Sequence, residues 1–159
     1  MKHQSHHQRH GNHSYLVFGI ELFVDFVIMY LVMYTMIATF DHFYLNLNNT
    51  YMTLMMVAPM AVVMMIAMRS MFPSKKANAA ILVAAVVTFA ASYYGMRTQA
   101  LVGDEEFLRS MIPHHSGAIL MCEQAVITDP EISTLCDQIV KSQREEISSM
   151  KTILARYKR

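Results

Sequence analysis

The stretch "YLVFGIELFVDFVIMYLVMYTMIATF", residues 15–40, decides the class of fold because it is an almost unbroken apolar run. A helix that crosses a bilayer needs about 20 mostly apolar residues, and this run meets that length. Two further runs, residues 51–71 and 77–96, meet the same requirement. We therefore expect an all-α chain with three transmembrane helices, in contact with membrane lipid.

The composition narrows the classes of function. A formal net charge of +1 gives no electrostatic reason to expect nucleic acid as a partner. The sequence shows no nucleophile–base motif, phosphate loop or hydrolytic zinc signature, so we do not expect an enzyme. The unusual counts are 16 Met and 8 His, and both side chains bind soft or borderline metal ions. The chain is methionine-rich and histidine-rich in a way that favours metal binding.

The apolar runs divide the chain into a His-rich head at 1–14, a membrane domain at 15–97 and a polar segment at 98–159. We expect the head to be disordered, with loose binding of cytoplasmic metal as the alternative. Lys and Arg occur in the head and between the second and third runs, but not between the first and second. The positive-inside rule then predicts a cytoplasmic N-terminus and a C-terminal segment on the outer face. We expect a multi-pass protein of a bacterial inner membrane, where that segment would be periplasmic.

Helix signals divide the C-terminal segment into an antiparallel hairpin. Asp104 is expected to cap a first helix, and acidic residues follow it, where the helix dipole favours them. Asp129 and Pro130 have the order of a cap and a first helical residue, which predicts a second helix. Two helices are too few to bury a core alone. We expect a second copy to complete a four-helix bundle, as a homodimer or higher homo-oligomer.

A turn centred on Asp129 sets the register of this hairpin. Residues equally distant from Asp129 along the chain lie opposite each other, so Cys122 faces Cys136 and His115 faces Gln143. In an oxidising compartment the two cysteines could form a disulfide, act as a pair of ligands, or do neither.

Soft and borderline metal ligands gather on the apolar face of the hairpin. Met111 lies about one helical turn before the adjacent His114 and His115, and Met121 follows further along the same face. The register also brings Met150 within about a turn of Met111. Thioether and imidazole groups with little carboxylate nearby suit Cu(I). The alternative is that these residues fill a small helical core, with the histidines hydrogen-bonded inside it.

Two segments of this region, "EFLRSMIPHHSGAILMCEQA" and "EISTLCDQIVKSQREEISSM", resemble the family catalogued as domain of unknown function 305. The resemblance covers residues 104–154. It implies a ferritin-like helical domain, and several members are linked to copper binding and copper resistance in bacteria. Only one helix pair is present where many members have two, which favours a site completed by a dimer. The family's pattern falls on Met111, His114, His115, Met121, Gln143, Glu146 and Met150, and the resemblance implies that the Met and His residues hold copper.

The membrane runs carry signals of their own. Glu21 and Asp25 lie one turn apart, and ionisable groups inside a membrane are costly and usually mark function or a buried polar contact. We expect a membrane-anchored protein that binds Cu(I) for copper handling or resistance, by sequestration or by transfer to a copper-handling partner. The alternatives are an oligomeric metal or proton-coupled conduit and a structural membrane module. A methionine ladder adds to the conduit hypothesis, although it also suits a lipid-facing surface: Met52, Met56, Met60, Met64 and Met68.

Overall fold

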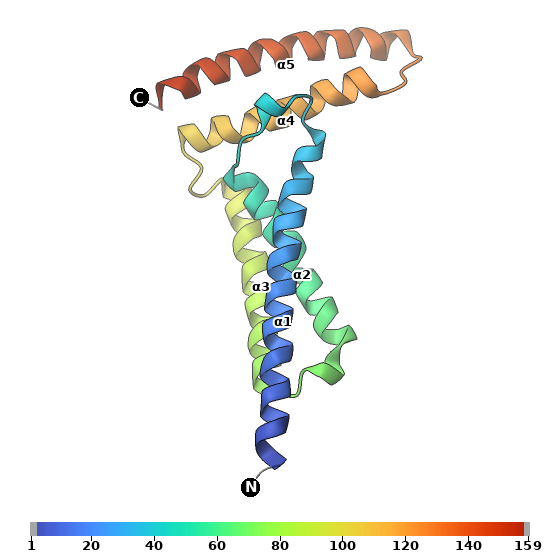
Figure 1. The fold of residues 1–159 in the computed structure, drawn as a ribbon. Coiled ribbons are helices and arrows are strands. Elements are labelled where there is room, and N and C mark those ends of the chain that lie inside the picture. The colour runs from blue at the N-terminus through green and yellow to red at the C-terminus, as the bar shows by residue number, and fades with distance from the viewer. Residues whose placement is uncertain (1–2, 158–159) are drawn as a thin grey trace. The chain divides into compact units, whose positions relative to one another are not determined.

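The computed structural model describes the backbone of residues 3–157 and the side chains of residues 13–157. Every regular element in this part of the chain is helical (Figure 1), which confirms the predicted all-α class. The long helices are α1 (His3–Val32), α2 (Leu47–Ala67), α3 (Lys75–Thr98), α4 (Asp104–Gln124) and α5 (Pro130–Arg156).

The chain forms two compact units, and each unit combines two separate stretches of sequence. Met1–Tyr30 and Thr50–Ala100 form the first, which we call the membrane unit. Leu31–Asn49 and Leu101–Arg159 form the second, which we call the hairpin unit. The loop between α1 and α2 therefore belongs with the hairpin that follows it much later in the sequence.

Three helical stretches are long and apolar enough to cross a membrane, as predicted: His13–Met36, Leu47–Ala67 and Lys75–Thr98. The backbone of α1 already begins at His3, so its helix includes most of the head that we expected to be disordered. The side chains of the first 12 residues, and with them the head's predicted metal binding, lie outside the described residues.

The first helix ends earlier than the apolar run predicts. α1 stops at Val32, a 3-10 turn Met33–Met36 follows, and Ile37 adopts extended backbone with ψ 139°. The next backbone N–H, of Ala38, donates to the Ser116 hydroxyl at 2.7 Å instead of continuing the helix. Tertiary contacts thus override the local apolar pattern.

Aromatic and small residues pack the helices of the membrane unit together. Phe18 packs edge-to-face against Phe72 with ring centroids 5.3 Å apart, within a buried cluster that includes Met65. At Gly95 the helices approach so closely that an added Cβ would lie 2.9 Å from the Tyr51 ring. The last two methionines of the ladder, Met64 in α2 and Met68 just after it, pack against this cluster as core residues do.

The hairpin unit confirms the predicted helix pair and much of its register. The side chain of Asp129 caps α5 by accepting from the N–H groups of Glu131 and Ile132 at 2.8 and 3.2 Å. Cys122 and Cys136 form a disulfide, so they do face each other. Gly103, rather than Asp104, is the N-cap of α4, and Asp104 is its first helical residue. The core lies between the two helices and consists of Leu108, Ile112, Ile119, Ile147, Met150 and Leu154.

The loop between α1 and α2 lies on α4, which the sequence did not predict (Figure 1). Ser116 is fully buried under it and contacts both Ala38 and His42, whose Nδ1 is 2.8 Å from the hydroxyl oxygen. Asp41 of the loop forms an ion pair with Lys151 of α5. Part of the covering surface that two helices require is therefore supplied by this chain itself. The second copy remains a prediction.

Candidate metal centre

His115 is the best-positioned of the predicted ligands. It is 8% exposed and lies at the interface of α4 and α5. Its Nδ1 is 2.9 Å from the backbone carbonyl oxygen of Met111, one turn earlier in the same helix. A carbonyl oxygen only accepts hydrogen bonds, so Nδ1 carries the proton and donates. Metal-ligating histidines typically use one ring nitrogen in this way and coordinate through the other.

The other ring nitrogen of His115 meets a carboxylate. Nε2 is 2.7 Å from Oε2 of Glu146, whose Oε1 accepts from the Ser142 hydroxyl at 2.6 Å. Hydrogen bonds from Ser142 and then from His115 hold the pKa of Glu146 below its usual value, so the carboxyl is ionised at neutral pH. A carboxylate cannot donate, so in the hydrogen bond between them Nε2 is the donor. His115 is thus joined to Met111 on its own helix and to Glu146 on α5.

The partner of His115 corrects the predicted register by one turn, because we expected Gln143 and the structure shows Glu146. The side chains of helical residues lean toward the N-terminus of their own helix. In an antiparallel hairpin, that direction on α4 is toward the C-terminus of α5. The contact consequently moves from Gln143 to the residue one turn later.

Three of the predicted ligands share one seam. Met150 is buried in the hairpin core at 9% exposure, Met111 packs against that core, and His115 is bonded to the Met111 backbone. His114 and Met121 lie outside it. His114 is exposed, with its ring 6.2 Å from that of His115, and Met121 is 60% exposed. The five predicted residues therefore do not surround one point.

Among the described residues, no group of three or more His, Cys, Asp or Glu side chains could hold a metal ion. A site on the seam would combine the His115 imidazole and soft thioethers with the Glu146 carboxylate. The expectation of little carboxylate near these ligands is therefore wrong at His115. The assignment of the five residues to one metal ion stays a prediction.

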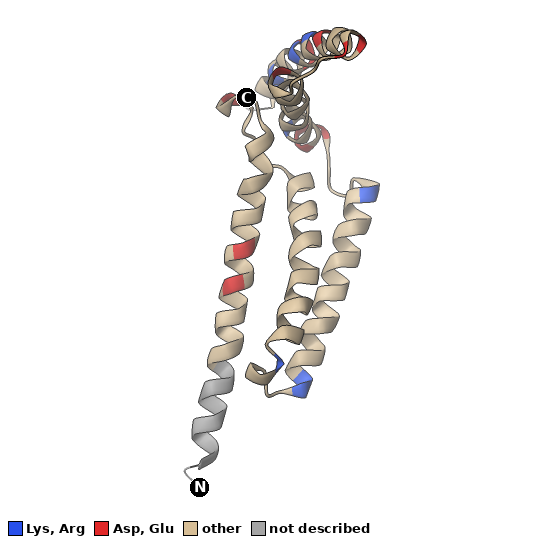
Figure 2. Ribbon diagram, turned by 90° about the vertical axis from the view of Figure 1, so that its right-hand side faces the viewer, with Lys and Arg blue, Asp and Glu red and all other residues tan. Residues whose placement is uncertain are grey.

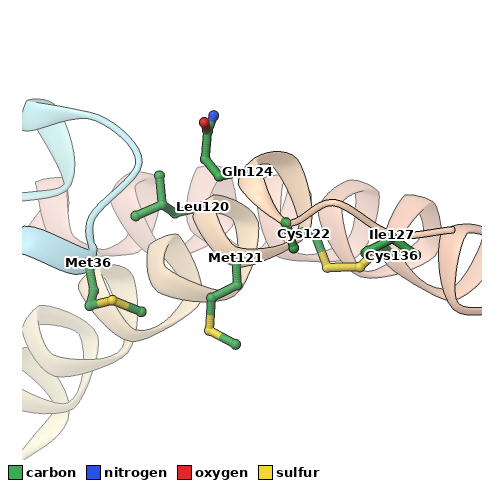
Figure 3. Close-up of a pocket in the computed structure, with 8 residues that line it drawn as sticks. Met36, Leu120, Met121, Cys122, Gln124, Ile127 and Cys136 are labelled. Atoms are coloured by element: carbon green, nitrogen blue, oxygen red, sulfur yellow. A yellow bond between two sulfur atoms is a disulfide. The ribbon is translucent and has the colours of Figure 1, made fainter.

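Met121 faces a separate cavity at the turn end of the hairpin. The cavity has a volume of about 510 Å³ and includes Met36 of the α1–α2 loop and the Cys122–Cys136 disulfide among its lining residues. Figure 3 shows the Met36 and Met121 side chains as well as the disulfide that joins α4 to α5.

His42 is a residue of the site region that sequence reasoning missed. It lies in the loop against Ser116, and its Nε2 is 3.8 Å from Asp41. Burial, and after it the positive charge of Lys151, lower the pKa of the imidazole. No spacing pattern links positions 42 and 116, which are 74 residues apart. The only sequence signal for its role was a histidine in the short loop between the first two apolar runs.

The described residues form an all-helical protein with three helices long and apolar enough to span a membrane and a disulfide-linked helical hairpin. A family model described as "Domain of unknown function (DUF305)" matches residues 96–154, which contain α4 and most of α5. "Uncharacterized protein L153" of Acanthamoeba polyphaga mimivirus is 39% identical over 112 residues, which are 69% of this chain and 72% of that protein. The chain belongs to the DUF305 family. No solved structure matches it.

Proposed function

We propose that this protein is a membrane-anchored Cu(I)-binding protein whose hairpin unit serves copper handling or resistance. The observation that carries the proposal is the geometry of His115. Its Nδ1 donates to the Met111 carbonyl, which leaves Nε2, bonded to Glu146 in this structure, as the nitrogen that would bind a metal ion in place of its proton. The Met150 side chain lies in the core between the same two helices. This is the arrangement expected of a ligating histidine with soft thioether neighbours.

The charge of the site favours a monovalent ion. Nε2 of His115 shares a proton with the ionised carboxyl of Glu146. Cu(I) carries the same single positive charge as that proton. Replacing one by the other leaves the charge balance with Glu146 unchanged, whereas a divalent ion would add a charge beside the buried His115 ring.

The exposure of two predicted ligands, His114 and Met121, supports the predicted assembly of two copies. Phe107, His114 and Met121 are spaced seven residues apart, so they form one stripe along α4. Phe107 is 50% exposed and Met121 60% exposed, which leaves an apolar stripe in contact with solvent. We propose that a second copy packs on this stripe, completes a four-helix bundle, and brings His114 and Met121 into the copper site from two sides.

The disulfide supports the proposed location of the hairpin unit. Disulfides persist in oxidising compartments such as the bacterial periplasm and are rare in the cytosol. Cys122–Cys136 therefore agrees with a periplasmic hairpin anchored in a bacterial inner membrane. A copper-handling protein of the same compartment would be its partner in transfer.

The test is a Cu(I) titration of the full chain in detergent against a competing chromophoric chelator. We expect stoichiometric binding by the wild type and its loss when His114→Ala and His115→Ala are combined. The matched control is His13→Ala, which removes an exposed histidine outside the hairpin unit. Helicity measured by circular dichroism checks that the double variant is folded. Equal affinity of the double variant and wild type would refute the proposal.

A second candidate function, a proton- or metal-conducting oligomer, is favoured by the acids of α1. Glu21 is exposed and Asp25 half-buried within the first membrane-spanning stretch, where Figure 2 shows acidic residues in red. Charged groups within a membrane are expected to face other helices or water. A second copy on this face of α1 would provide that environment. Reconstituted vesicles test the idea, since absence of proton and metal flux with folded protein present would exclude it.

A further inference from the structure

A groove lined by all three helices lies within the membrane unit. It has a volume of about 370 Å³ and is lined by residues 15–22 of α1, 54–61 of α2 and 81–88 of α3, each helix contributing one face. Only Tyr15 and Thr88 are polar among the described lining residues, and none of them is charged. Because an unpaired polar group is costly in such surroundings, the lining favours a hydrocarbon ligand.

Small residues form the groove and open it to the surface of the unit. Ala58, Ala61 and Ala85 line it as buried residues, whereas Gly19 and Ala84 line it and are exposed. A Cβ added at Gly19 would meet no packed atom within 4 Å, so a larger side chain at this position could extend into the groove. In a bilayer, lipid hydrocarbon surrounds a helix at this level, and the exposed side of the groove is therefore accessible to it.

A basic loop lies between α2 and α3, and its cations are exposed: Arg69, Lys75 and Lys76. Figure 2 shows basic residues in blue at the end of the membrane unit where these two helices are joined. Among the residues whose side chains are described, no acidic group forms an ion pair with any of the three cations. The sequence has no Asp or Glu from 42 to 103, so neither α2 nor α3 carries a compensating charge. The loop consequently offers a net positive charge that an anion can complement.

Tyr15 connects this basic loop to the groove. It lines the groove, and its hydroxyl donates to Oδ1 of Asn78 at 2.7 Å and accepts from the Ser74 N–H at 3.2 Å. Ser74 is the N-cap of α3, and Lys75 and Lys76 follow it as the first two helical residues. The apolar groove and the basic residues are thus held together within one unit.

The distance from the lysines to the far end of the groove matches one leaflet of a bilayer. Lys75 and Thr88 are 13 positions apart in α3. At the rise of an α-helix this separation is about 20 Å along the axis. One leaflet with its headgroup region is also about 20 Å thick, half of the bilayer. A phospholipid with its phosphate at the lysines would therefore have an acyl chain at the level of the groove.

We propose that the membrane unit binds one anionic phospholipid, with its phosphate at the basic loop and one acyl chain in the groove. Clusters of Lys and Arg beside membrane-spanning helices attract anionic headgroups. A zwitterionic lipid offers the same hydrocarbon without net charge, so the loop determines the selectivity. A second copy packed on the groove would bring its own three cations to the same side of the membrane, and this repulsion favours lipid as the occupant.

The first experiment measures lipid retained by the full chain. The protein, purified in detergent, is mixed with equal amounts of phosphatidylglycerol and phosphatidylcholine that have identical acyl chains, and native mass spectrometry counts the lipids bound to each chain. We expect one phosphatidylglycerol per chain, preferred by at least about tenfold over phosphatidylcholine. Equal retention of the two lipids would overturn the proposal.

Two matched pairs of variants assign the headgroup and acyl-chain contacts. Lys75→Gln combined with Lys76→Gln should lower the preference by at least about fivefold, whereas Arg97→Gln, at the other end of α3, should leave it unchanged. Gly19→Leu should abolish retention, whereas Ala90→Leu, at an exposed position outside the groove lining, should not. Helicity and thermal unfolding measured by circular dichroism check that each variant is folded. Unchanged preference in the lysine variant or full retention by folded Gly19→Leu would refute the site.

A photoactivatable phosphatidylglycerol locates the bound lipid in a membrane. The probe carries a diazirine on one acyl chain and is present at a low fraction in phosphatidylcholine vesicles that contain the full chain. We expect the label on peptides that include residues 15–22 and 81–88. Label spread evenly over the three helices would contradict a specific site. Dimers cross-linked through Gly19→Cys, without label in the groove, would assign the groove to a second copy and overturn the proposal.

Discussion

Reduction of the disulfide should loosen the turn end of the hairpin much more than the opposite end. The buried core of the unit runs from Leu108 to Ile119 on α4 and from Ile147 to Leu154 on α5. The first turns of α5 contribute nothing to it, since Ile132 is 50% and Leu135 53% exposed. Beyond the core, the hairpin depends on Cys122–Cys136 and the turn.

The expected loss follows from the length of the loop that the disulfide closes. The two cysteines are 14 positions apart. In the chain-entropy model, closing a loop of about 15 residues contributes about 3 kcal/mol at 25 °C. The nearby Arg144–Glu123 ion pair is largely exposed and contributes about 0–1 kcal/mol. The disulfide therefore stabilises the turn end more than the ion pair does, and about 3 kcal/mol corresponds to roughly a hundredfold change in an opening equilibrium.

Hydrogen exchange of the full chain in detergent measures this effect locally. Backbone amides at the turn end should exchange roughly a hundredfold faster after reduction, while amides of α3 in the membrane unit provide the internal control. The cysteine-to-serine double variant should reproduce the result without reductant. Acceleration of less than about tenfold would refute the reasoning, because the core would then stabilise the whole hairpin.

Three further predictions concern packing and charge. Ile112→Ala, at a fully buried position, should destabilise the hairpin unit by about 2–5 kcal/mol in hydrogen exchange, and a loss below about 1 kcal/mol would contradict its place in the core. The lowered pKa of His42 means that its stabilising contact with Ser116 is complete above pH about 6.5 and declines as pH falls toward the folded-state pKa. His42→Asn should remove that part of the pH dependence of thermal unfolding, and an unchanged profile would exclude His42 as the group. Gly95→Ala should lower the melting temperature in detergent, because its Cβ would meet the Tyr51 ring at 2.9 Å, and an unchanged value would show that the ring moves aside freely.

The features that the sequence predicts well depend on short-range rules. The three helices that are long and apolar enough to cross a membrane follow from the length of their apolar runs, and α5 begins where Asp129 and Pro130 place it. That Cys122 faces Cys136 follows from a tight turn and antiparallel geometry, and the disulfide is one of the three alternatives that the sequence left open. In each case the rule acts within a helix or across one turn.

The candidate site was harder to predict because the buried face of α4 is narrower than its apolar pattern. We expected one broad inward face containing both histidines and Met121. Two helices cover a single stripe, which includes Ile112 and His115, while His114 and Met121 lie on its exposed side. A step of one residue on a helix rotates a side chain by about 100°, which separates His114 from His115.

The contacts of the α1–α2 loop lie beyond any local rule. Ala38 and His42 meet Ser116 through single hydrogen bonds, and such polar contacts leave no periodic trace in the sequence. Two-helix geometry alone suggested a missing partner surface. It could not show that a loop from earlier in the chain supplies part of it.

The shared Ser116 hydroxyl also imposes an order on synthesis. Ala38 leaves the ribosome 78 residues before Ser116 does. At 5–20 residues per second, the loop waits on the order of ten seconds for the helix on which it will rest. Until then the Ala38 N–H lacks the acceptor that it has in the folded structure. The hairpin unit can therefore reach its final form only after Ser116 has been synthesised, and a fragment that starts at α4 would lack the segment that covers Ser116.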